Sequence, residues 1–157
     1  MEITIFGKGN MGKAIGGNFE KAGQKVTYGG RDFKGALGDM VVLAVPYGAV
    51  DSILSAHKEE LAGKVVVNIT NPVNFDTFAG VLAAGKVGEK EPTVVLAASD
   101  SADAKKKLAQ ALEGSGLSVM DAGSLKRARE MEALGFLQIS LAAGKKISWT
   151  GGFAVLH

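Results

Sequence analysis

The segment EITIFGKGNMG, residues 2–12, decides how the rest of the chain is interpreted. Its first half is rich in β-branched and aromatic residues and predicts a strand over Glu2–Phe6. The second half fits G-x-G-x-x-G, the pattern that joins the first strand of a dinucleotide-binding unit to its first helix. In that pattern Gly7 allows a tight turn, Gly9 lets a pyrophosphate approach the backbone, and Gly12 lets the helix pack close to the strand. The segment therefore predicts dinucleotide binding by free N–H groups at the helix start, the alternative being a glycine-rich turn without a ligand.

Beyond this segment, apolar stretches that predict strands alternate with amphipathic stretches that predict helices. Strands are expected at Glu2–Phe6, Lys25–Tyr28, Met40–Val45, Lys64–Ile69, Thr93–Ala98, Leu117–Met120 and Phe153–Leu156. Helices are expected at Asn10–Ala22, Tyr47–Leu61, from a cap at Ser101 to Glu113, and Ser124–Ala143. This alternation predicts an α/β fold of the Rossmann type, doubly wound around a mainly parallel sheet.

We expect a single dinucleotide-binding domain over residues 1–157. Its C-terminal helix and short strand, from about residue 124, are expected to form an element on the dimer or substrate side. The apolar residues that this helix should turn inward are Leu125, Ala128, Met131, Leu134 and Leu137. Core positions are also expected for Phe136 and Leu141.

Composition and charge narrow the function classes. Apolar residues make up 46% and charged residues 22% of the chain, as in ordinary globular domains. The net charge of +2 gives no reason to expect a nucleic-acid partner, and no apolar run approaches the ~20 residues of a membrane span. Cysteine is absent and only two histidines are present, so no metal site is expected. We therefore expect a cytoplasmic protein without a membrane partner.

The end of the second predicted strand, YGGRD at residues 28–32, favours NADP over NAD. Proteins that bind NAD usually place Asp or Glu at this position, to accept hydrogen bonds from the ribose hydroxyls. Here Gly30 and the glycine before it make room, and the guanidinium of Arg31 matches a phosphate in bidentate geometry. Lys8 could add a second cation on the same phosphate. The alternatives are that both cations are solvated, or that Asp32 pairs with Arg31 and weakens the phosphate site.

The next two predicted strands end in loops that contain proline. A flat proline backbone could lie against the nicotinamide ribose, and an asparagine could bond the ribose or the carboxamide. Proline is also an ordinary first residue of a helix, and Tyr47 is better suited to line a pocket than to act as an acid. The candidate cofactor contacts in these loops are Ala44, Val45, Pro46, Tyr47, Thr70, Asn71 and Pro72.

Several spaced motifs together resemble the deazaflavin-dependent NADP reductases and their bacterial relatives. They are GKGNMGKAIG (7–16), GGR (29–31), AVP (44–46), NITNP (68–72) and DAGSLKRAREME (121–132). The resemblance covers nearly the whole chain and implies hydride transfer between NADPH and a flavin-like ring, in a homodimer. It implies cofactor contacts at Gly7, Lys8, Gly9, Asn10, Met11, Gly12, Gly30, Arg31, Val45, Pro46 and Asn71.

The chain departs from this family between the Asn-Pro segment and the strand at Thr93–Ala98. Family members place a helix and another strand there, whereas here only Val73–Pro92 separates the two segments. The strand is missing near Gly80 and Val81, so the sheet closes up, a partner supplies a strand, or residues are absent from the sequence. We favour absent residues, and a Cα separation far above the ~3.8 Å of a trans peptide would mark the place.

No residue in the predicted strand-end loops is a convincing general acid or base, so no catalytic residue is assigned. Hydride transfer to a carbonyl normally needs a proton donor, whereas transfer between stacked rings depends mainly on proximity and orientation. The expected function is an NADP(H)-dependent oxidoreductase with a flavin-like or other small acceptor. One alternative is a non-catalytic NADP-binding or redox-sensing module. Another is a pyrroline-carboxylate type of reductase, for whose long helical dimerisation domain the chain is too short.

The remaining polar features have structural interpretations. The basic runs at Lys105–Lys107 and Lys126–Arg129 are expected to be solvated helix faces, and His57 is expected to be exposed. Residues 121–123 should form a turn into the last helix, with Ser124 as its cap. The resemblance implies that this turn lies near the flavin-like ring that accepts the hydride, so a role of the turn in binding the substrate stays open. Trp149 could line the site or a dimer interface.

Overall fold

The structure, a computed structural model, describes residues 1–70 and 93–148 of the chain. The chain divides into a first unit, Met1–Ala79, and a second unit, Gly80–His157. The single domain with a distinct C-terminal element stays a prediction. Four other predictions fall outside the described residues: the strand at Phe153–Leu156, the contacts of Asn71 and Pro72, the place of Trp149, and the departure at Gly80 and Val81.

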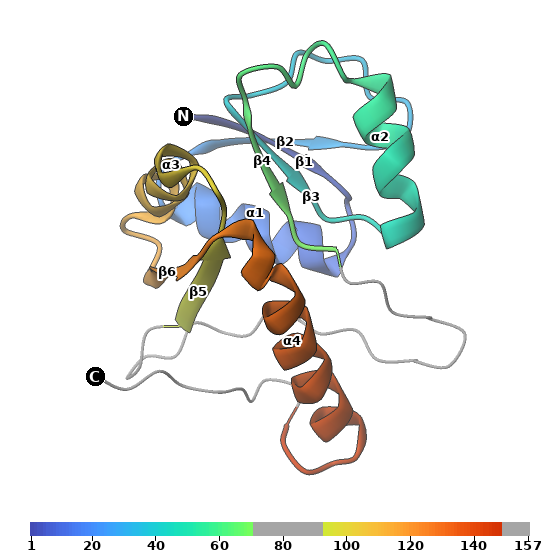
Figure 1. The fold of residues 1–157 in the computed structure, drawn as a ribbon. Coiled ribbons are helices and arrows are strands. Elements are labelled where there is room, and N and C mark those ends of the chain that lie inside the picture. Colours follow the sequence, from blue (N-terminus) through green and yellow to red (C-terminus); the bar gives the residue numbers. More distant parts are fainter. Residues whose placement is uncertain (71–92, 149–157) are drawn as a thin grey trace. The chain divides into compact units, whose positions relative to one another are not determined.

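Four parallel strands form the sheet of the first unit, in the order β2-β1-β3-β4 (Figure 1). Their bounds are β1 Glu2–Phe6, β2 Lys25–Gly29, β3 Met40–Leu43 and β4 Val65–Asn68. The two central strands are buried throughout apart from the exposed Glu2, as expected for apolar strands covered on both faces. The strands predicted in this unit are confirmed to within one or two residues at each end.

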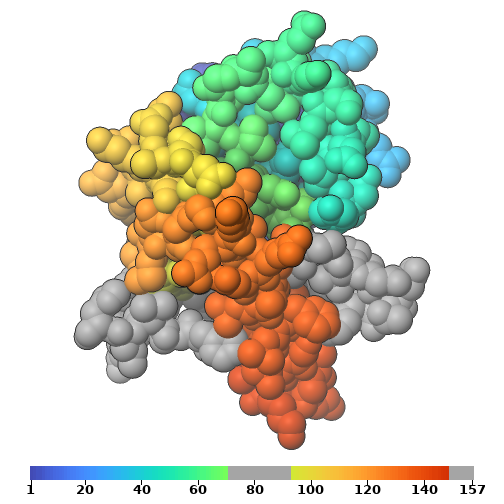
Figure 2. Space-filling model, in the orientation of Figure 1, coloured from blue at the N-terminus to red at the C-terminus, as the bar shows by residue number. Residues whose placement is uncertain are grey.

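Two helices complete the first unit. Helix α1 (Asn10–Lys21) connects β1 to β2, and α2 (Val50–Ala56), preceded by the 3-10 turn η1 (Tyr47–Ala49), connects β3 to β4. The chain steps in opposite directions along the sheet after β1 and after β3, so right-handed crossovers place the two helices on opposite faces. This arrangement confirms the doubly wound, Rossmann-type fold. Helix α2, in teal, forms part of the outer surface of this unit in the space-filling view (Figure 2).

Helix α2 is shorter than the helix predicted over Tyr47–Leu61. It ends at Ala56, and the chain continues in turns as far as Gly63, which has a φ of +75°. The N–H group of Leu61 still donates to the carbonyl of His57 at 3.0 Å, so Leu61 packs against the core from an isolated turn. The apolar residues that predicted one long helix, among them Ile53, Leu54 and Leu61, therefore all pack against the core, although the helix itself ends at Ala56.

The second unit begins with a strand, a helix and a strand. Strands β5 (Thr93–Ala98) and β6 (Leu117–Gly123) are parallel, with an irregularity in register at Ala97/Ala98, and α3 (Ala102–Leu112) connects them. The predicted cap of α3 is confirmed, because Ser101 Oγ accepts a hydrogen bond from the Ala104 N–H at 3.1 Å. The predicted turn at residues 121–123 is wrong, because these residues extend β6.

Helix α4 (Ala128–Ala143), preceded by the 3-10 turn η3 (Leu125–Arg127), turns inward only part of the face predicted: Ala128 and Met131 are half-buried as expected, whereas three leucines are not. Leu134 and Leu137 are 39% and 49% exposed, and Leu125 and Phe136 are exposed as well. The positions that are buried or half-buried at helical spacing are Ala128, Met131, Gly135, Gln138 and Ala142, and Leu141 is half-buried. The helix is apolar on more than one side, so its periodicity alone could not fix the inner face. No helix in the described part of the chain has the length and apolar character that a membrane crossing requires.

Candidate functional site

The carboxyl edge of the first sheet contains a switch point between β1 and β3. The chain leaves these neighbouring strands in opposite directions, and doubly wound sheets bind ligands outside the strand ends at such a point. The loops that follow the two strands are in close contact. The Ala44 N–H donates to the Phe6 carbonyl at 2.8 Å, and a Cβ added at Gly7 would lie 2.1 Å from the Ala44 carbonyl oxygen. The switch point is therefore where the predicted glycine loop lies.

The three glycines of this loop have different structural requirements. Gly7 has a φ of +119°, and it has no room for a side chain beside Ala44. Gly12 is buried in the first turn of α1, where an added Cβ would lie 2.0 Å from the Gly7 carbonyl oxygen. Gly9 is exposed, has an extended backbone, and would bring an added Cβ within 4 Å of no other atom. Packing within the protein thus explains Gly7 and Gly12 but not Gly9.

The N-terminus of α1 is open to an anion. Gly9 is the N-cap and supplies no side-chain hydrogen bond, and the first helical bond runs from the Lys13 N–H to the Gly9 carbonyl at 3.0 Å. Within residues 1–70 and 93–148, no acceptor is found for the backbone N–H groups of Asn10, Met11 and Gly12. The first turn also contains no acidic side chain. These donors and the positive end of the helix dipole can therefore bind a phosphate.

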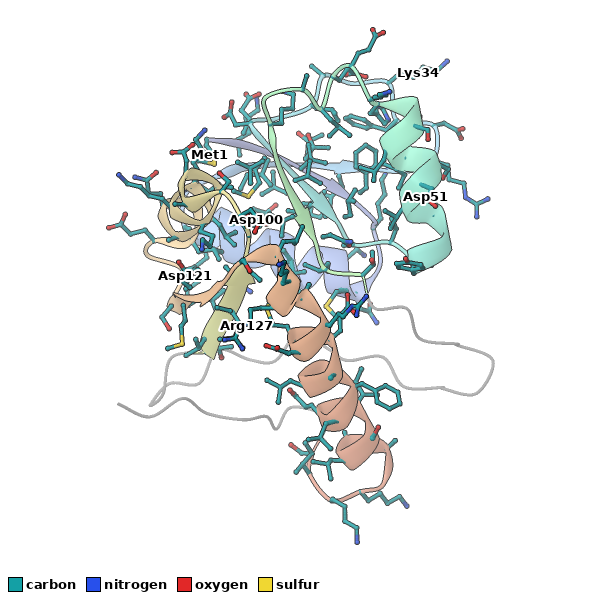
Figure 3. The ribbon with its side chains drawn as sticks, in the orientation of Figure 1. Met1, Lys34, Asp51, Asp100, Asp121 and Arg127 are labelled. Atoms are coloured by element: carbon teal, nitrogen blue, oxygen red, sulfur yellow. The ribbon has the colours of Figure 1, made fainter. Side chains whose placement is uncertain are left out.

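A β-turn follows β2 and presents the predicted phosphate ligand. The Phe33 N–H donates to the Gly30 carbonyl at 3.2 Å, which places Arg31 and Asp32 at the two corners of the turn. Both corner residues are exposed, and within the described ranges no ion pair joins them. Lys8 is exposed as well, and so is Lys34, which extends from the loop beyond the turn (Figure 3). The guanidinium of Arg31 is thus not neutralised by its acidic neighbour.

Only one of the two glycines before Arg31 leaves free space. An added Cβ at Gly30 would meet no atom within 4 Å. At Gly29 it would lie 3.1 Å from the ring of Phe6 and 3.2 Å from the ring of Phe33. The expectation that both glycines make room for a phosphate is therefore wrong for Gly29, which makes room for two aromatic rings.

The loops after β3 and β4 present the remaining candidates. Ala44 and Val45 are half-buried, whereas Pro46 and Tyr47 are exposed, Tyr47 at 56%. Pro46 immediately precedes η1 and accepts the hydrogen bond of the Ala49 N–H at 2.9 Å, so it also serves as a helix start. After β4, the side-chain oxygen of Asn68 accepts hydrogen bonds from the N–H and hydroxyl of Thr70, at 2.9 and 2.7 Å. Asn68 was not among the predicted site residues, although it stands in the NITNP motif.

His57 is the clearest correction within the first unit. It was expected to be exposed beside Lys58 and Glu59, but it is only 9% exposed. Its ring centroid lies 5.1 Å from that of Phe6 and 6.4 Å from that of Phe33. Its Nδ1 lies 2.9 Å from Glu60 Oε1. His57 is therefore a packed residue, and its ring contacts the residue that closes the Arg31 turn.

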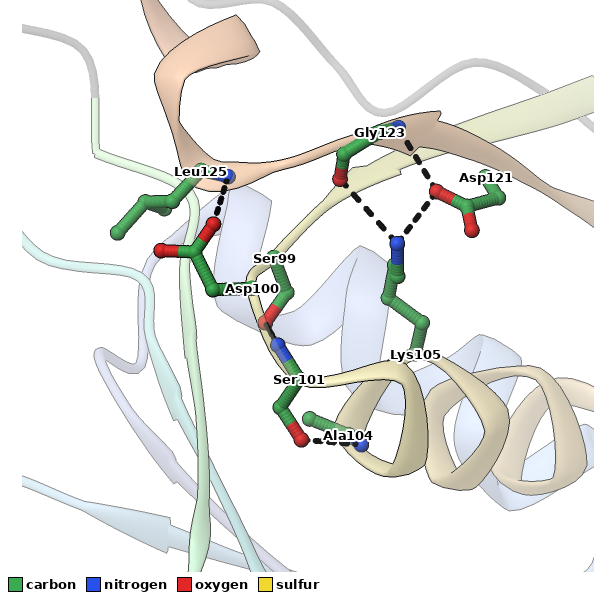
Figure 4. A network of polar contacts seen from close by, with 8 residues as sticks. All are labelled: Ser99, Asp100, Ser101, Ala104, Lys105, Asp121, Gly123 and Leu125. Carbon is green, nitrogen blue, oxygen red and sulfur yellow. Dashed lines mark hydrogen bonds and ion pairs between the residues drawn. The ribbon is translucent and has the colours of Figure 1, made fainter.

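In the second unit, hydrogen bonds join the loop after β5 and helix α3 to the end of β6 and the start of η3 (Figure 4). Lys105 Nζ donates to Asp121 Oδ1 at 2.6 Å and to the Gly123 carbonyl at 3.2 Å. Asp100 Oδ1 accepts from the Leu125 N–H at 3.1 Å, so Asp100 caps the turn that Ser124 was expected to cap. The hydrogen bond from Lys105 holds the pKa of Asp121 below its usual value, with help from the Gly123 N–H. Lys105, expected on a solvated face, is only 15% exposed in its side chain.

The order of the strands, the position of the glycine loop and the open helix terminus define a Rossmann-type dinucleotide-binding fold. Comparison of the sequence with protein-family models and with curated proteins found no match. Solved structures do match. One is a protein of Arthrobacter sp. FB24 with a proposed F420-dependent NADP reductase activity, at a TM-score of 0.76 and 20% identity over 100% of both chains.

Two other similar structures are larger reductases. An imine reductase of Streptomyces aurantiacus has a TM-score of 0.67 and 16% identity, over 92% of this chain and 64% of the reductase. The pyrroline carboxylate reductase of Plasmodium falciparum, solved with NADP bound, has a TM-score of 0.55 and 18% identity. That match covers 95% of this chain and 71% of the reductase. At these identities the likeness establishes the fold.

Proposed function

We propose that the chain is an NADP(H)-dependent oxidoreductase whose cofactor lies across the carboxyl edge of the first sheet. The observation that carries the proposal is Gly9, an exposed N-cap glycine that packing within the protein does not require. A pyrophosphate that approaches the backbone gives this glycine a reason, and the free N–H groups beside it supply the hydrogen bonds. The proposed contacts are Gly7, Lys8, Gly9, Asn10, Met11, Gly12, Gly30, Arg31, Ala44, Val45, Pro46, Tyr47, Thr70, Asn71 and Pro72.

The turn after β2 favours NADP over NAD. Gly30 leaves open space, and Arg31 stands beside it on the exposed corner of the turn without an ion pair to Asp32. A guanidinium can bind the 2′-phosphate of NADP through two parallel hydrogen bonds. The nearest acid, Asp32, is the second corner of the turn instead of the residue at the strand tip, where an NAD-binding carboxylate would stand. Of the similar structures, the Arthrobacter protein is described as an NADP reductase and the Plasmodium enzyme was solved with NADP bound.

The acceptor is proposed to be a flavin-like ring or another small molecule that stacks on the nicotinamide. In the described loops at the first sheet's carboxyl edge, as far as Thr70, no ion pair joins an acidic side chain to a basic one. Ring-to-ring hydride transfer needs no such pair, since proximity and orientation are the protein's main contribution. The F420 dependence proposed for the Arthrobacter protein is of this chemical class. A non-catalytic NADP-binding or redox-sensing module is the second candidate, because the same residues would bind the cofactor without an acceptor.

We also propose a homodimer that uses α4. Leu134 and Leu137 expose apolar side chains on this helix, and burial of one such side chain stabilises an interface by roughly 1.5–3 kcal/mol before the costs of association. Sedimentation of the wild-type chain and of Leu137→Glu tests this: a dimer that the substitution dissociates is expected. A monomeric wild-type chain would rule the dimer out.

The NADP assignment is tested by titrating NADPH and NADH into the wild-type chain and into Arg31→Ala, at one fixed ionic strength. Charge-assisted contacts to the 2′-phosphate are worth roughly 1.5–3 kcal/mol, so NADPH should bind at least about tenfold more tightly than NADH. Arg31→Ala should remove most of this preference and leave the Kd for NADH unchanged. Lys8→Ala should show the same effect to a smaller degree.

Lys21→Ala is the matched control for these charge changes. Lys21 is an exposed lysine at the other end of α1, ~16 Å along the helix from the loop. Equal affinities for the two cofactors, or a preference that survives Arg31→Ala, would refute the proposed phosphate site. Consumption of NADPH with flavins, deazaflavins and quinones then separates the two candidate functions, since a binding module turns over none of them.

A further inference from the structure

Three aromatic rings from three separate segments meet under the turn that presents Arg31. Phe6 is the last residue of β1, Phe33 closes the turn after β2, and His57 follows the end of α2. The rings of Phe6 and Phe33 meet edge to face with centroids 5.7 Å apart, and the His57 ring contacts both. Phe6 belongs to the buried core cluster, and Phe33 packs against that cluster. The ring cluster of Phe6, Phe33 and His57 therefore connects the turn to the centre of the sheet.

Glycines on both sides leave the space that the Phe33 ring occupies. A Cβ added at Gly35 would lie 2.8 Å from the tip of this ring, and one added at Gly29 would lie 3.2 Å from its base. The backbone of the turn thus approaches the ring closely on both sides. Truncation of Phe33 would remove the side chain around which residues 29–35 are packed.

His57 is held in place from its own side of the ring cluster. Its backbone N–H donates to the Ile53 carbonyl at 3.1 Å, and its ring is paired with Glu60 at 2.9 Å. Its ring is buried against the rings of Phe6 and Phe33, and in the described ranges no hydrogen bond, ion pair or ring contact joins His57 to Arg31. An effect of His57 on Arg31 therefore passes through Phe33, or through Phe6 and the backbone at Gly29.

We infer that Phe33 and His57 are positioning residues that determine cofactor specificity by fixing the turn from which Arg31 reaches the 2′-phosphate. Arg31 itself has a long side chain, and no ion pair holds it within residues 1–70 and 93–148, so the position of its backbone decides where the guanidinium can reach. A bidentate contact with phosphate depends on that geometry. The inference rests on the proposed NADP function. It adds to the proposed cofactor contacts two residues, Phe33 and His57, that act on specificity without touching the cofactor.

The test compares Phe33→Ala and His57→Ala with the wild-type chain by titration of NADPH and of NADH. Both variants should weaken NADPH by about fivefold or more, a large part of the roughly tenfold or greater preference that a charge-assisted contact provides. NADH, which has no 2′-phosphate, should bind as it does to the wild-type chain. His57→Phe keeps a ring at this position and should restore the preference. Phe33→Leu is the milder variant if Phe33→Ala does not fold.

Leu54→Ala is the matched control for lost stability. Leu54 packs against the same core cluster from α2 but is not one of the three rings, so it should lower the melting temperature without changing the ratio of the two affinities. Parallel weakening of both cofactors, or an unchanged ratio, in Phe33→Ala and His57→Ala overturns the inference. If Arg31→Ala changes the ratio while these variants do not, the inference alone fails. If Arg31→Ala also leaves the ratio unchanged, the proposed phosphate site fails with it.

Discussion

Replacing Gly12 by alanine adds one methyl group at the closest contact of the glycine loop. The new Cβ would lie 2.0 Å from the Gly7 carbonyl oxygen, whereas ordinary van der Waals contact begins at 3.4 Å. The two backbone segments must therefore separate by about 1.4 Å, the difference between these distances. Gly7 cannot yield easily, because its N–H is bonded to the Gly29 carbonyl at 3.1 Å and its Cα faces Ala44. The strain should consequently spread to the ends of β1, β2 and β3.

Two effects of opposite sign decide the stability of Gly12→Ala. Alanine is favoured over glycine inside a helix by about 1 kcal/mol. Overpacking a buried site costs about 1–3 kcal/mol, and the upper value applies here because the obstacle is backbone. We expect a net loss of about 2 kcal/mol in the free energy of unfolding. Because the loop that binds the pyrophosphate is displaced, the Kd for NADPH should also rise at least about tenfold.

Gly17→Ala is the matched control, because Gly17 lies in the same helix and an added Cβ there would meet nothing within 4 Å. It should gain up to about 1 kcal/mol from helix propensity alone and keep its affinity for NADPH. Urea unfolding gives the two free energies, and calorimetric titration gives the two affinities. If Gly12→Ala were stabilised like Gly17→Ala, or bound NADPH as the wild-type chain does, the close packing of α1 on the glycine loop would be wrong.

Two further predictions address the ligand side of the loop and the second unit. Gly9→Ala should fold with a loss of at most about 1 kcal/mol, since only N-cap preference opposes it, yet weaken NADPH severalfold; unchanged affinity would show that no phosphate lies against Gly9. Because Lys105 lowers the pKa of Asp121, the ion pair stabilises the fold above about pH 4 and loses this effect as the pH falls through the lowered pKa. Asp121→Asn should therefore flatten the acid limb of a plot of unfolding free energy against pH, and an unaltered limb would contradict the role of the pair.

Features that depend on local sequence were predicted well. The strand Glu2–Phe6 and the cap at Ser101 match the structure, because a strand of the central sheet and an N-cap are each specified within a few neighbouring residues. The place of the glycine loop also followed from adjacent residues. The doubly wound, parallel class of the sheet was predicted from the alternation of elements and from handedness rules, whereas the strand order comes from the structure.

Features that depend on distant contacts were missed. His57 lies between charged neighbours in the sequence, and nothing there indicates that Phe6 and Phe33, 51 and 24 positions away, would enclose its ring. On α4, Ala128 and Met131 lie inward as predicted, but Leu134 and Leu137 do not, and small residues such as Gly135 and Ala142 take the other inward positions. In both cases the sequence shows the polarity and size of each side chain, whereas its burial depends on distant residues that pack against it.

The structure of the glycine loop shows which glycines of the G-x-G-x-x-G motif are required by the fold and which could instead indicate a bound ligand. G-x-G-x-x-G occurs by chance in many sequences, and a glycine that the fold itself requires says nothing about a ligand. Gly7 and Gly12 are of this kind, because the carbonyls of Ala44 and of Gly7 would exclude their side chains in the absence of any cofactor. Gly9 has free space and an ordinary backbone conformation, so close packing does not require glycine there, and the general preference for glycine at N-caps is the one local reason for it. The same reasoning separates Gly29, which accommodates two rings, from Gly30, which accommodates nothing in the protein. Gly9 at the helix start and Gly30 before Arg31 are two of the glycines that packing does not require, and both lie in loops of the candidate site, where the pyrophosphate and the 2′-phosphate of NADP are proposed to lie.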